Sequence, residues 1–268
     1  MIVVAALLRF GTICKADTII RSSFILQLKT KLFIKGVIRL IISGFQKMTL
    51  LDFPGKVACT IFTGGCNFRC PFCHNALLVT EDFKAEFSEE EILSFLEKRK
   101  GLLDGVCITG GEPLLHNDIA DFIRKIKEMG YAVKLDTNGS FPDRLKALVD
   151  EELVDYVAMD IKNCMEKYAP TAGSDETILP RIEESIDFLL SGKVGYEFRT
   201  TVVKEPHGIS DISAAAERIR GAERYFLQYF EDSGGLISDG LSAVDKETME
   251  QMKNAAQIHI PQTAIRGG

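Results

Sequence analysis

The chain has 268 residues, of which 46% are hydrophobic and 26% charged, which is the composition of one globular domain. It contains no run of about 18 apolar residues, so the sequence predicts no helix that spans a membrane. Residues 1–47 hold eight of the 32 basic residues and one of the 38 acidic residues, so the rest of the chain is acidic and lacks the basic field that attracts nucleic acid.

Residues 1–40 show no clear structural pattern. The apolar run at residues 2–8 has no basic region before it and no convincing small-residue cleavage site after it, so we do not expect a signal peptide. Residues 24–40 alternate apolar and basic side chains, as a basic amphipathic element would. We expect residues 1–40 to be an N-terminal extension that is disordered or precedes the true translation start, and residues 41–268 to form the functional domain.

From Lys56 onward, strand-like and helix-like segments alternate, which predicts β/α units around a parallel sheet. The predicted strands are residues 57–63, 106–109, 132–136, 156–160, 195–203 and 224–229. The predicted helices are residues 88–99, 119–129, 143–149, 180–190, 210–220 and 247–256, and a last extended segment covers 262–266. Six such repeats predict an α/β fold, an incomplete (β/α)6 TIM-like barrel.

Three cysteines, Cys66, Cys70 and Cys73, form a C-x3-C-x2-C array directly after the first predicted strand. Cysteine thiolates hold iron–sulfur clusters. A [4Fe–4S] cluster has four irons, so three cysteines leave one iron open for chemistry. The alternatives are a turn that happens to hold cysteines or a zinc site with His74 as fourth ligand, but zinc commonly takes two cysteine pairs and no second pair follows. Seven cysteines, an odd number, also argue against a secreted disulfide framework and for a reducing cytosol.

Further polar motifs lie at the ends of the next three predicted strands: Gly110-Gly111-Glu112-Pro113, Thr137-Asn138-Gly139 directly after Asp136, and Asp160-Ile161-Lys162. In barrels of this kind, chemistry takes place at the carboxyl ends of the strands. The alternatives are ordinary turns and surface ion pairs, the latter worth only ~0–1 kcal/mol. Arg199 lies within the fifth predicted strand, where an inward guanidinium needs an anion: either a ligand carboxylate or a carboxylate of this chain.

The array, with Phe72 before its third cysteine, resembles the radical S-adenosylmethionine (SAM) superfamily. The longer stretch, from Gly44 through Leu51-Asp-Phe-Pro-Gly-Lys to Cys73-His-Asn, resembles the activating enzymes of glycyl-radical enzymes. Their branch that activates anaerobic ribonucleoside-triphosphate reductase is the most similar. The resemblance runs from about Ile41 to the C-terminus and is specific in its first third. Many activating enzymes carry a further ferredoxin-like cysteine cluster, which this chain lacks between Cys73 and Cys107.

The resemblance implies two cofactors, a [4Fe–4S] cluster on Cys66, Cys70 and Cys73, and SAM bound to its open iron through the amino and carboxylate groups. The stretch from Gly110 to Pro113 matches the family's GGEP motif, in which two glycines allow close backbone approach to a ligand.

Individual side chains take implied roles in holding SAM or the target. Glu112 offers an acceptor for the ammonium group, and Arg199 a partner for the methionine carboxylate. Phe72 and His74 are expected to pack against adenine. The remaining candidates, for the ribose, the methionine part or the target peptide, are Asp136, Asn138, Asp160 and Lys162.

The implied reaction is reductive cleavage of SAM to a 5′-deoxyadenosyl radical, which takes a hydrogen atom from a backbone glycine of a partner enzyme. We expect a glycyl-radical enzyme as partner, in particular anaerobic ribonucleotide reductase, with a flavodoxin- or ferredoxin-type electron donor in the cytoplasm. The alternatives are activation of pyruvate formate-lyase and radical chemistry on a small molecule or peptide. A more distant one is a non-enzymatic metal-binding or electron-transfer module.

Overall fold

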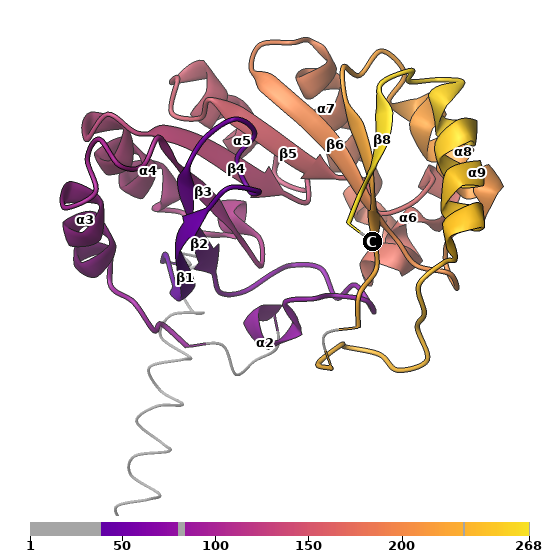
Figure 1. The fold of residues 1–268 in the computed structure, drawn as a ribbon, viewed down its shortest axis with the longest axis horizontal. Coiled ribbons are helices and arrows are strands. Elements are labelled where there is room, and N and C mark those ends of the chain that lie inside the picture. The colour runs from indigo at the N-terminus through magenta and orange to yellow at the C-terminus, as the bar shows by residue number, and fades with distance from the viewer. Residues whose placement is uncertain (1–38, 80–83, 233, 268) are drawn as a thin grey trace, which may run out of the picture. The chain divides into compact units, whose positions relative to one another are not determined.

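The computed structural model describes residues 39–79, 84–232 and 234–267, and the sheet with its helices belongs to one compact unit that begins at Leu40 (Figure 1). The expected N-terminal extension, residues 1–40, lies outside the described residues except for Arg39 and Leu40, and stays a prediction. In the described ranges, every helix is too short or too polar to cross a bilayer.

Eight strands lie in chain order in one sheet. They are β1 (Ile42–Thr49), β2 (Ala58–Thr63), β3 (Gly105–Gly110), β4 (Ala132–Thr137), β5 (Tyr156–Asp160), β6 (Gly195–Val202), β7 (Tyr225–Tyr229) and β8 (Thr263–Arg266). The first pair is antiparallel and every later pair is parallel. The strands β1 and β8 are the two edges of this sheet and do not pair with each other, so the sheet is open. The fold is therefore an open TIM-like barrel, and all six predicted strands and the last extended segment are confirmed.

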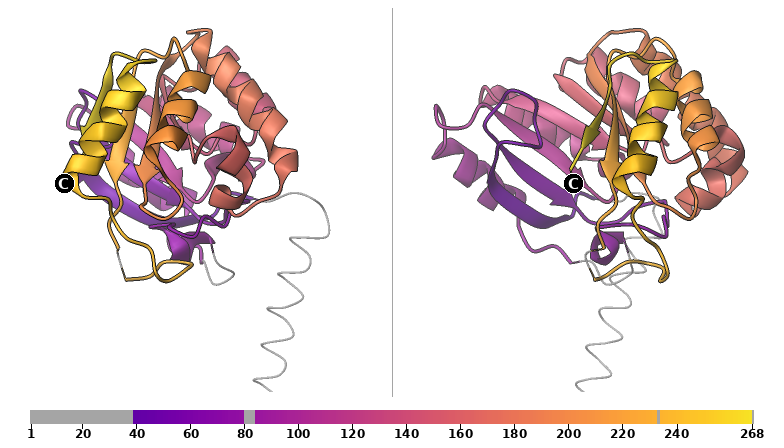
Figure 2. Two further views of the ribbon diagram at one scale, coloured as in Figure 1. Left: turned by 90° about the vertical axis from the view of Figure 1, so that its right-hand side faces the viewer. Right: turned by 45° about the vertical axis from the view of Figure 1, so that its right-hand side comes forward.

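The long helices follow the strands and lie on the outer side of the curved sheet, whereas the single turn α2 lies with the cysteine loop (Figures 1 and 2). They are α2 (Ala76–Val79), α3 (Glu89–Glu97), α4 (Ile119–Glu128), α5 (Pro142–Asp150), α6 (Met165–Ala172), α7 (Leu179–Leu190), α8 (Ile209–Arg218) and α9 (Lys246–Gln257), with 3-10 turns η1 (Pro113–Leu115) and η2 (Glu176–Ile178). Each long helix buries one apolar face, as α4 does with Phe122, Ile123 and Ile126. All six predicted helices are confirmed.

Besides the single turns α2, η1 and η2, the strand β1 and the helix α6 were not predicted, and both lack the usual pattern. The edge strand β1 is exposed at Gln46, Lys47 and Met48, so its sequence does not alternate between apolar and polar residues. The helix α6 has only eight residues and contains Pro170, which cannot donate a backbone hydrogen bond.

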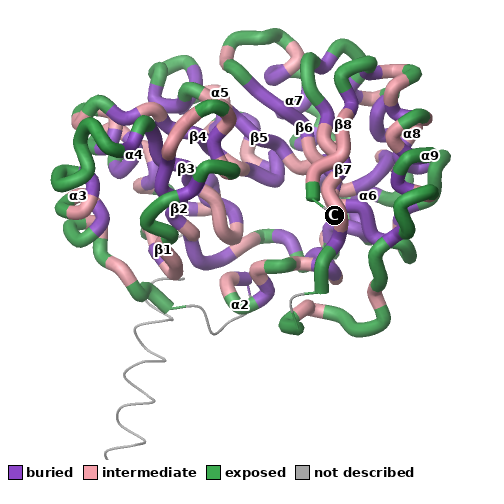
Figure 3. The backbone as a smooth tube through the Cα atoms, in the orientation of Figure 1, coloured by how far each residue is buried: buried purple, intermediate pink, exposed green. Residues whose placement is uncertain are grey.

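The side chains of β4 that point into the barrel are polar, whereas those that point outward are apolar. In β4, Val133 and Leu135 belong to the hydrophobic core, whereas Lys134 and Asp136 form an ion pair with each other. Because successive side chains of a strand point to opposite faces, these charged residues share the inner face. The central strands β2 to β5 are largely buried (Figure 3). Of the two inward charges of β4, Lys134 is buried and Asp136 is half-buried.

The C-terminus of α6 packs directly against the loop that holds the three cysteines. The Arg69 backbone N–H donates to the Ala172 carbonyl at 3.0 Å. The next residue, Gly173, caps α6 with a φ of 60°, and a Cβ placed on it would lie 2.1 Å from the Arg69 carbonyl oxygen. A glycine is therefore required both by the backbone conformation and by the close approach.

We predict that Gly173→Ala destabilises the protein more than Gly192→Ala. Both glycines have positive φ, which costs an alanine about 1–2 kcal/mol. Only the substitution at Gly173 adds a steric conflict, of about 1–3 kcal/mol, because a Cβ on Gly192 meets nothing within 4 Å. Urea unfolding of the cluster-free variants measures both free energies. Equal losses of stability would show that the contact with the cysteine loop carries no cost.

Candidate functional site at the carboxyl ends of the strands

The cysteine loop leaves β2 at Thr63 and lies against the end of β3 through backbone contacts. The Gly111 N–H donates to the Thr63 carbonyl at 2.8 Å, and the Glu112 N–H donates to the Gly65 carbonyl at 2.8 Å. A Cβ on Gly111 would lie only 1.9 Å from the Gly65 oxygen, so no side chain fits there. Asn75 adds a side-chain bond from Nδ2 to the Gly110 carbonyl at 3.2 Å. The array and the Gly-Gly turn are thus held together.

A cavity of about 190 Å³ lies between this loop and the strand ends. Its lining includes the predicted site residues Cys66, Cys70, Phe72, Cys73, His74, Gly110, Gly111, Asp136, Asn138, Asp160, Lys162 and Arg199. The other lining residues were not predicted as site residues, although Asn75 and Thr137 belong to motifs noted in the sequence. They are Phe68, Asn75, Val79, Thr109, Thr137 and Thr201. Of these, Thr201 lies two residues after Arg199 on β6, so strand alternation is the signal that could have found it.

The three thiols are in buried surroundings. Burial raises the pKa of all three, that of Cys66 to about 12, and the negative charges of Glu112 and Cys70 add to the effect at Cys66. The Cys66 sulfur accepts hydrogen bonds from the Phe68 backbone N–H at 3.3 Å and from Asn138 Nδ2 at 3.8 Å. The Cys70 thiol donates to the Ala172 carbonyl at 3.5 Å. Metal ligation would replace the thiol protons, so binding here releases protons.

No group of three His, Cys, Asp or Glu side chains in the described part of the chain is arranged to hold one metal ion. That finding disfavours the zinc alternative with His74 as a fourth ligand, because a zinc ion needs its ligands around a single point. It does not exclude a cluster, since each cysteine of a [4Fe–4S] cluster bonds a different iron and the sulfurs are held apart by the cluster itself.

Two predicted site residues, Glu112 and Pro113, are fully buried and do not line the cavity. The Glu112 carboxylate accepts from Leu114 N–H at 3.0 Å, Thr137 Oγ1 at 2.9 Å and Asn138 N–H at 2.7 Å. Burial raises the pKa of Glu112 to about 7, against the effect of these three donors. In this structure Glu112 joins the end of β3 to the end of β4, and its role as acceptor for an ammonium group stays a prediction.

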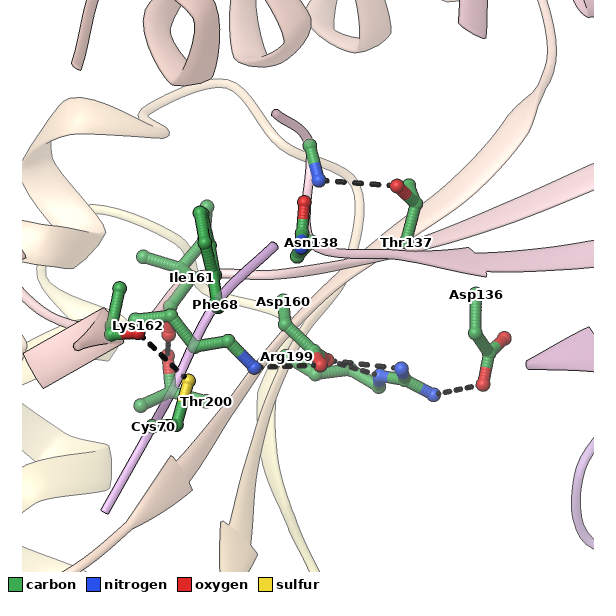
Figure 4. Close-up of polar contacts among 12 residues, drawn as sticks. Phe68, Cys70, Asp136, Thr137, Asn138, Asp160, Ile161, Lys162, Arg199 and Thr200 are labelled. Carbon is green, nitrogen blue, oxygen red and sulfur yellow. Dashed lines mark hydrogen bonds and ion pairs between the residues drawn. The ribbon is translucent and has the colours of Figure 1, made fainter. Parts of the chain in front are cut away.

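Charged side chains from β4, β5 and β6 form one network inside the barrel (Figure 4). The Arg199 guanidinium pairs with Asp136 at 2.9 Å and with Asp160 at 2.9 Å, and Asp160 also pairs with Lys162 at 3.0 Å. Lys134 completes it through its ion pair with Asp136. Arg199 therefore pairs with carboxylates of this chain, which was one of the two partners that the sequence suggested. Three basic and two acidic groups leave one net positive charge.

The network controls the protonation of its two aspartates. Burial alone would raise the pKa of Asp160, but the charges of Arg199 and Lys162 outweigh it and lower that pKa to about 2. The same balance, with Arg199 and Lys134 as the cations, lowers the pKa of Asp136. Both carboxylates are therefore ionised at neutral pH.

Two aromatic rings, those of Phe72 and His74, also line the cavity. The His74 ring stacks on Phe230 with centroids 5.7 Å apart, and burial lowers the pKa of His74, so its imidazole is neutral at neutral pH. Phe72 lies edge-on to His207 at 6.1 Å. Sequence reasoning missed His207, whose Nε2 lies 2.8 Å from the Lys162 carbonyl and fixes the turn after β5. Its sequence surroundings carry no motif that would have identified it.

The chain is similar in sequence to known proteins. Residues 60–189 match the family model described as "Radical SAM superfamily". The chain is 34% identical over 232 residues to the "Putative glycyl-radical enzyme activating enzyme MJ1227" of Methanocaldococcus jannaschii, covering 84% of this chain and 95% of that protein. It is 32% identical over 127 residues to the pyruvate formate-lyase-activating enzyme of Clostridium pasteurianum, covering 46% of this chain and 52% of that enzyme.

A similar fold occurs in the crystal structure of Streptococcus suis SuiB bound to S-adenosylmethionine. The TM-score is 0.61 at 14% identity, and the match covers 76% of this chain and 48% of the SuiB chain. At that identity the likeness concerns the fold alone.

We predict that Asp160→Asn makes stability less dependent on pH between about 4 and 2. Because the folded-state pKa of Asp160 is lowered from 3.8 to about 2, its carboxylate contributes stability above pH 3.8 that is lost as the pH falls through 2. The variant is expected to be less stable than wild type at pH 7, and the difference should shrink toward pH 2. Urea unfolding at steps of pH measures it. A constant difference across this range would contradict the assignment.

Proposed function

The chain belongs to the radical SAM superfamily, whose cofactors are a [4Fe–4S] cluster and SAM, and we propose that it is the activating enzyme of a glycyl-radical enzyme. The similarity to the Methanocaldococcus jannaschii protein, which covers 95% of that relative, supports this subtype. The Cys73-His74-Asn75 run that is typical of the activating enzymes supports it as well.

One observation carries the proposal: Cys66, Cys70 and Cys73 line the same cavity as the Gly110-Gly111 turn. The residues fit a cluster with an open iron, because three thiols line one cavity together with two glycines, where a ligand can approach the backbone closely. We propose that these three cysteines hold the cluster. When bound, the cluster and SAM supply one-electron reductive cleavage and removal of a hydrogen atom from the substrate.

The surplus positive charge of the barrel network supports a site for the carboxylate of SAM. Asp136 and Asp160 already neutralise most of the charge of Arg199, Lys134 and Lys162, and one positive charge remains. Lys162, which lines the cavity and has its ammonium within 3.0 Å of a single aspartate, is the cation we propose for this contact. Arg199 then acts by holding Asp160 and Asp136 in place.

Other groups around the cavity are candidates for contacts with the adenine, ribose and ammonium groups of SAM. We propose that the neutral His74 imidazole and the Phe72 ring pack against adenine, since both line the cavity next to the cysteines. Asp136 remains a candidate for the ribose or the target peptide, whereas the Asn138 amide already bonds Asn67 and Ser140. Glu112 can accept the ammonium group only if it gives up one of its three present donors.

We propose anaerobic ribonucleoside-triphosphate reductase as the partner and a flavodoxin- or ferredoxin-type protein as the electron donor, in the cytosol. The target glycine must lie on a flexible loop, and the open sheet, with β1 and β8 as its edges, leaves lateral room for such a loop. A second candidate partner is pyruvate formate-lyase, because the chain is 32% identical to its activating enzyme in Clostridium pasteurianum over 127 residues.

We predict that Cys70→Ala abolishes both the cluster absorbance after anaerobic reconstitution and the release of 5′-deoxyadenosine from SAM, down to the level without protein. Cys59→Ala is the matched control, because Cys59 is fully buried in β2 and does not line the cavity, so it should keep both. SAM cleavage that persists in Cys70→Ala would overturn the proposed ligand set. Zinc without iron in the purified wild type would favour a non-enzymatic metal-binding module instead.

We predict that the reduced enzyme with SAM generates a glycyl-radical EPR signal on purified anaerobic ribonucleoside-triphosphate reductase. The signal is expected only when both cofactors are present. The parallel reaction with pyruvate formate-lyase identifies the alternative partner. SAM cleavage with no radical on either protein would contradict the activating function and favour chemistry on a small molecule or peptide.

A further inference from the structure

The sulfur of Cys66 receives a side-chain hydrogen bond from a different strand end. Asn138, which follows β4, directs its Nδ2 at the Cys66 sulfur over 3.8 Å, while the Phe68 backbone N–H approaches the same sulfur at 3.3 Å. The backbone donor belongs to the cysteine loop and moves with it. The amide donor is supplied by the barrel, so its position relative to the sulfur is set by the fold.

The Asn138 amide has its orientation fixed by two polar neighbours. Its Oδ1 accepts from the Ser140 backbone N–H at 2.9 Å and from Ser140 Oγ at 2.6 Å. Its Nδ2 also donates to Asn67 Oδ1 at 3.0 Å, and Asn67 Nδ2 donates to Ser140 Oγ at 2.9 Å. With the oxygen held by two donors, the NH₂ group must face Cys66 and Asn67.

The backbone of Asn138 is held as firmly as its side chain. Its N–H donates to the buried Glu112 carboxylate at 2.7 Å, and the residue is only 6% exposed. Asn138 therefore has little freedom to turn its amide elsewhere, for example toward a ribose hydroxyl. The closed contact between Asn67, Asn138 and Ser140 also ties the first cysteine of the array to the end of β4 (Figure 4 shows Asn138 beside Thr137 there).

We infer that Asn138 is a positioning residue that donates a hydrogen bond to the Cys66 sulfur and thereby raises the reduction potential of the cluster. This inference rests on the proposed function. An N–H donor stabilises negative charge on a thiolate ligand, and the reduced cluster carries one more negative charge than the oxidised one. Hydrogen bonds to the sulfurs are among the factors that set the potential of iron–sulfur clusters. The bond thus favours uptake of the single electron that the donor protein delivers.

The test compares cluster potentials by EPR-monitored redox titration of the reconstituted protein without SAM. Asn138→Ala and Asn138→Leu, which remove the donor, are expected to shift the midpoint potential to more negative values at unchanged iron content. Asn163→Ala is the matched control, because Asn163 is fully buried, bonds Thr171 and the Pro206 carbonyl, and does not line the cavity. Its midpoint potential should equal that of wild type. Asn138 variants with the wild-type potential would overturn the inference.

A second measurement detects the hydrogen bond in the wild-type protein itself and uses the Asn138→Ala variant only to assign the signal. Wild type labelled with ¹⁵N only in asparagine side chains should show a ¹⁵N coupling to the reduced cluster in pulsed EPR, and Asn138→Ala should lose it. The lack of such a coupling in wild type would contradict the inference.

These outcomes separate the inference from the proposed function. If wild type cleaves SAM and the Asn138 variants keep its potential, only the role of Asn138 is wrong. If reconstituted wild type holds no cluster, the proposed function itself fails.

Discussion

The whole site depends on one close approach of two backbone segments, Gly65 in the cysteine loop and Gly111 at the end of β3. There is no room for a side chain between them, since a Cβ on Gly111 would lie 1.9 Å from the Gly65 oxygen. The contact is closed by hydrogen bonds from Gly111 to Thr63 and from Glu112 to Gly65. It fixes the cysteine loop across the strand ends, so that a loop without regular structure presents its thiols to a cavity whose other walls are rigid strands.

The ion pairs inside the barrel are also suited to the site. The inward charges of β4, β5 and β6 compensate one another almost completely, which is the condition for keeping charges in a buried space. The charge of the Lys162 ammonium lowers the pKa of all three thiols, against the effect of burial, and so favours the negative charge that thiolate ligands carry. Glu112 is a buried carboxylate with three donors and no ion pair, and it uses those donors to couple the turns after β3 and β4.

The sequence allowed most of the fold to be predicted, because strand-like segments with buried apolar residues alternate with long helices that show an apolar face. The predicted helix at residues 88–99 begins with a capping box of Ser88 and Glu91, a pattern that is visible in the sequence. The edge strand β1 and the helix α6 escaped prediction, since the first lacks alternation and the second contains Pro170. For the site, strand ends predicted which residues meet, but not their partners. The pairing of Arg199 with two aspartates, the burial of Glu112 and the contact of Asn138 with Cys66 depend on side-chain directions that one sequence does not reveal.

The most direct test of the central claim, that Cys66, Cys70 and Cys73 hold a cluster with one open iron, is EPR of the anaerobically reconstituted and reduced protein with and without SAM. A [4Fe–4S] signal whose g-values change when SAM is added is the predicted result, because SAM then binds the iron that has no cysteine ligand. A protein that takes up zinc in place of iron, or a cluster signal that is the same with and without SAM, would contradict the account.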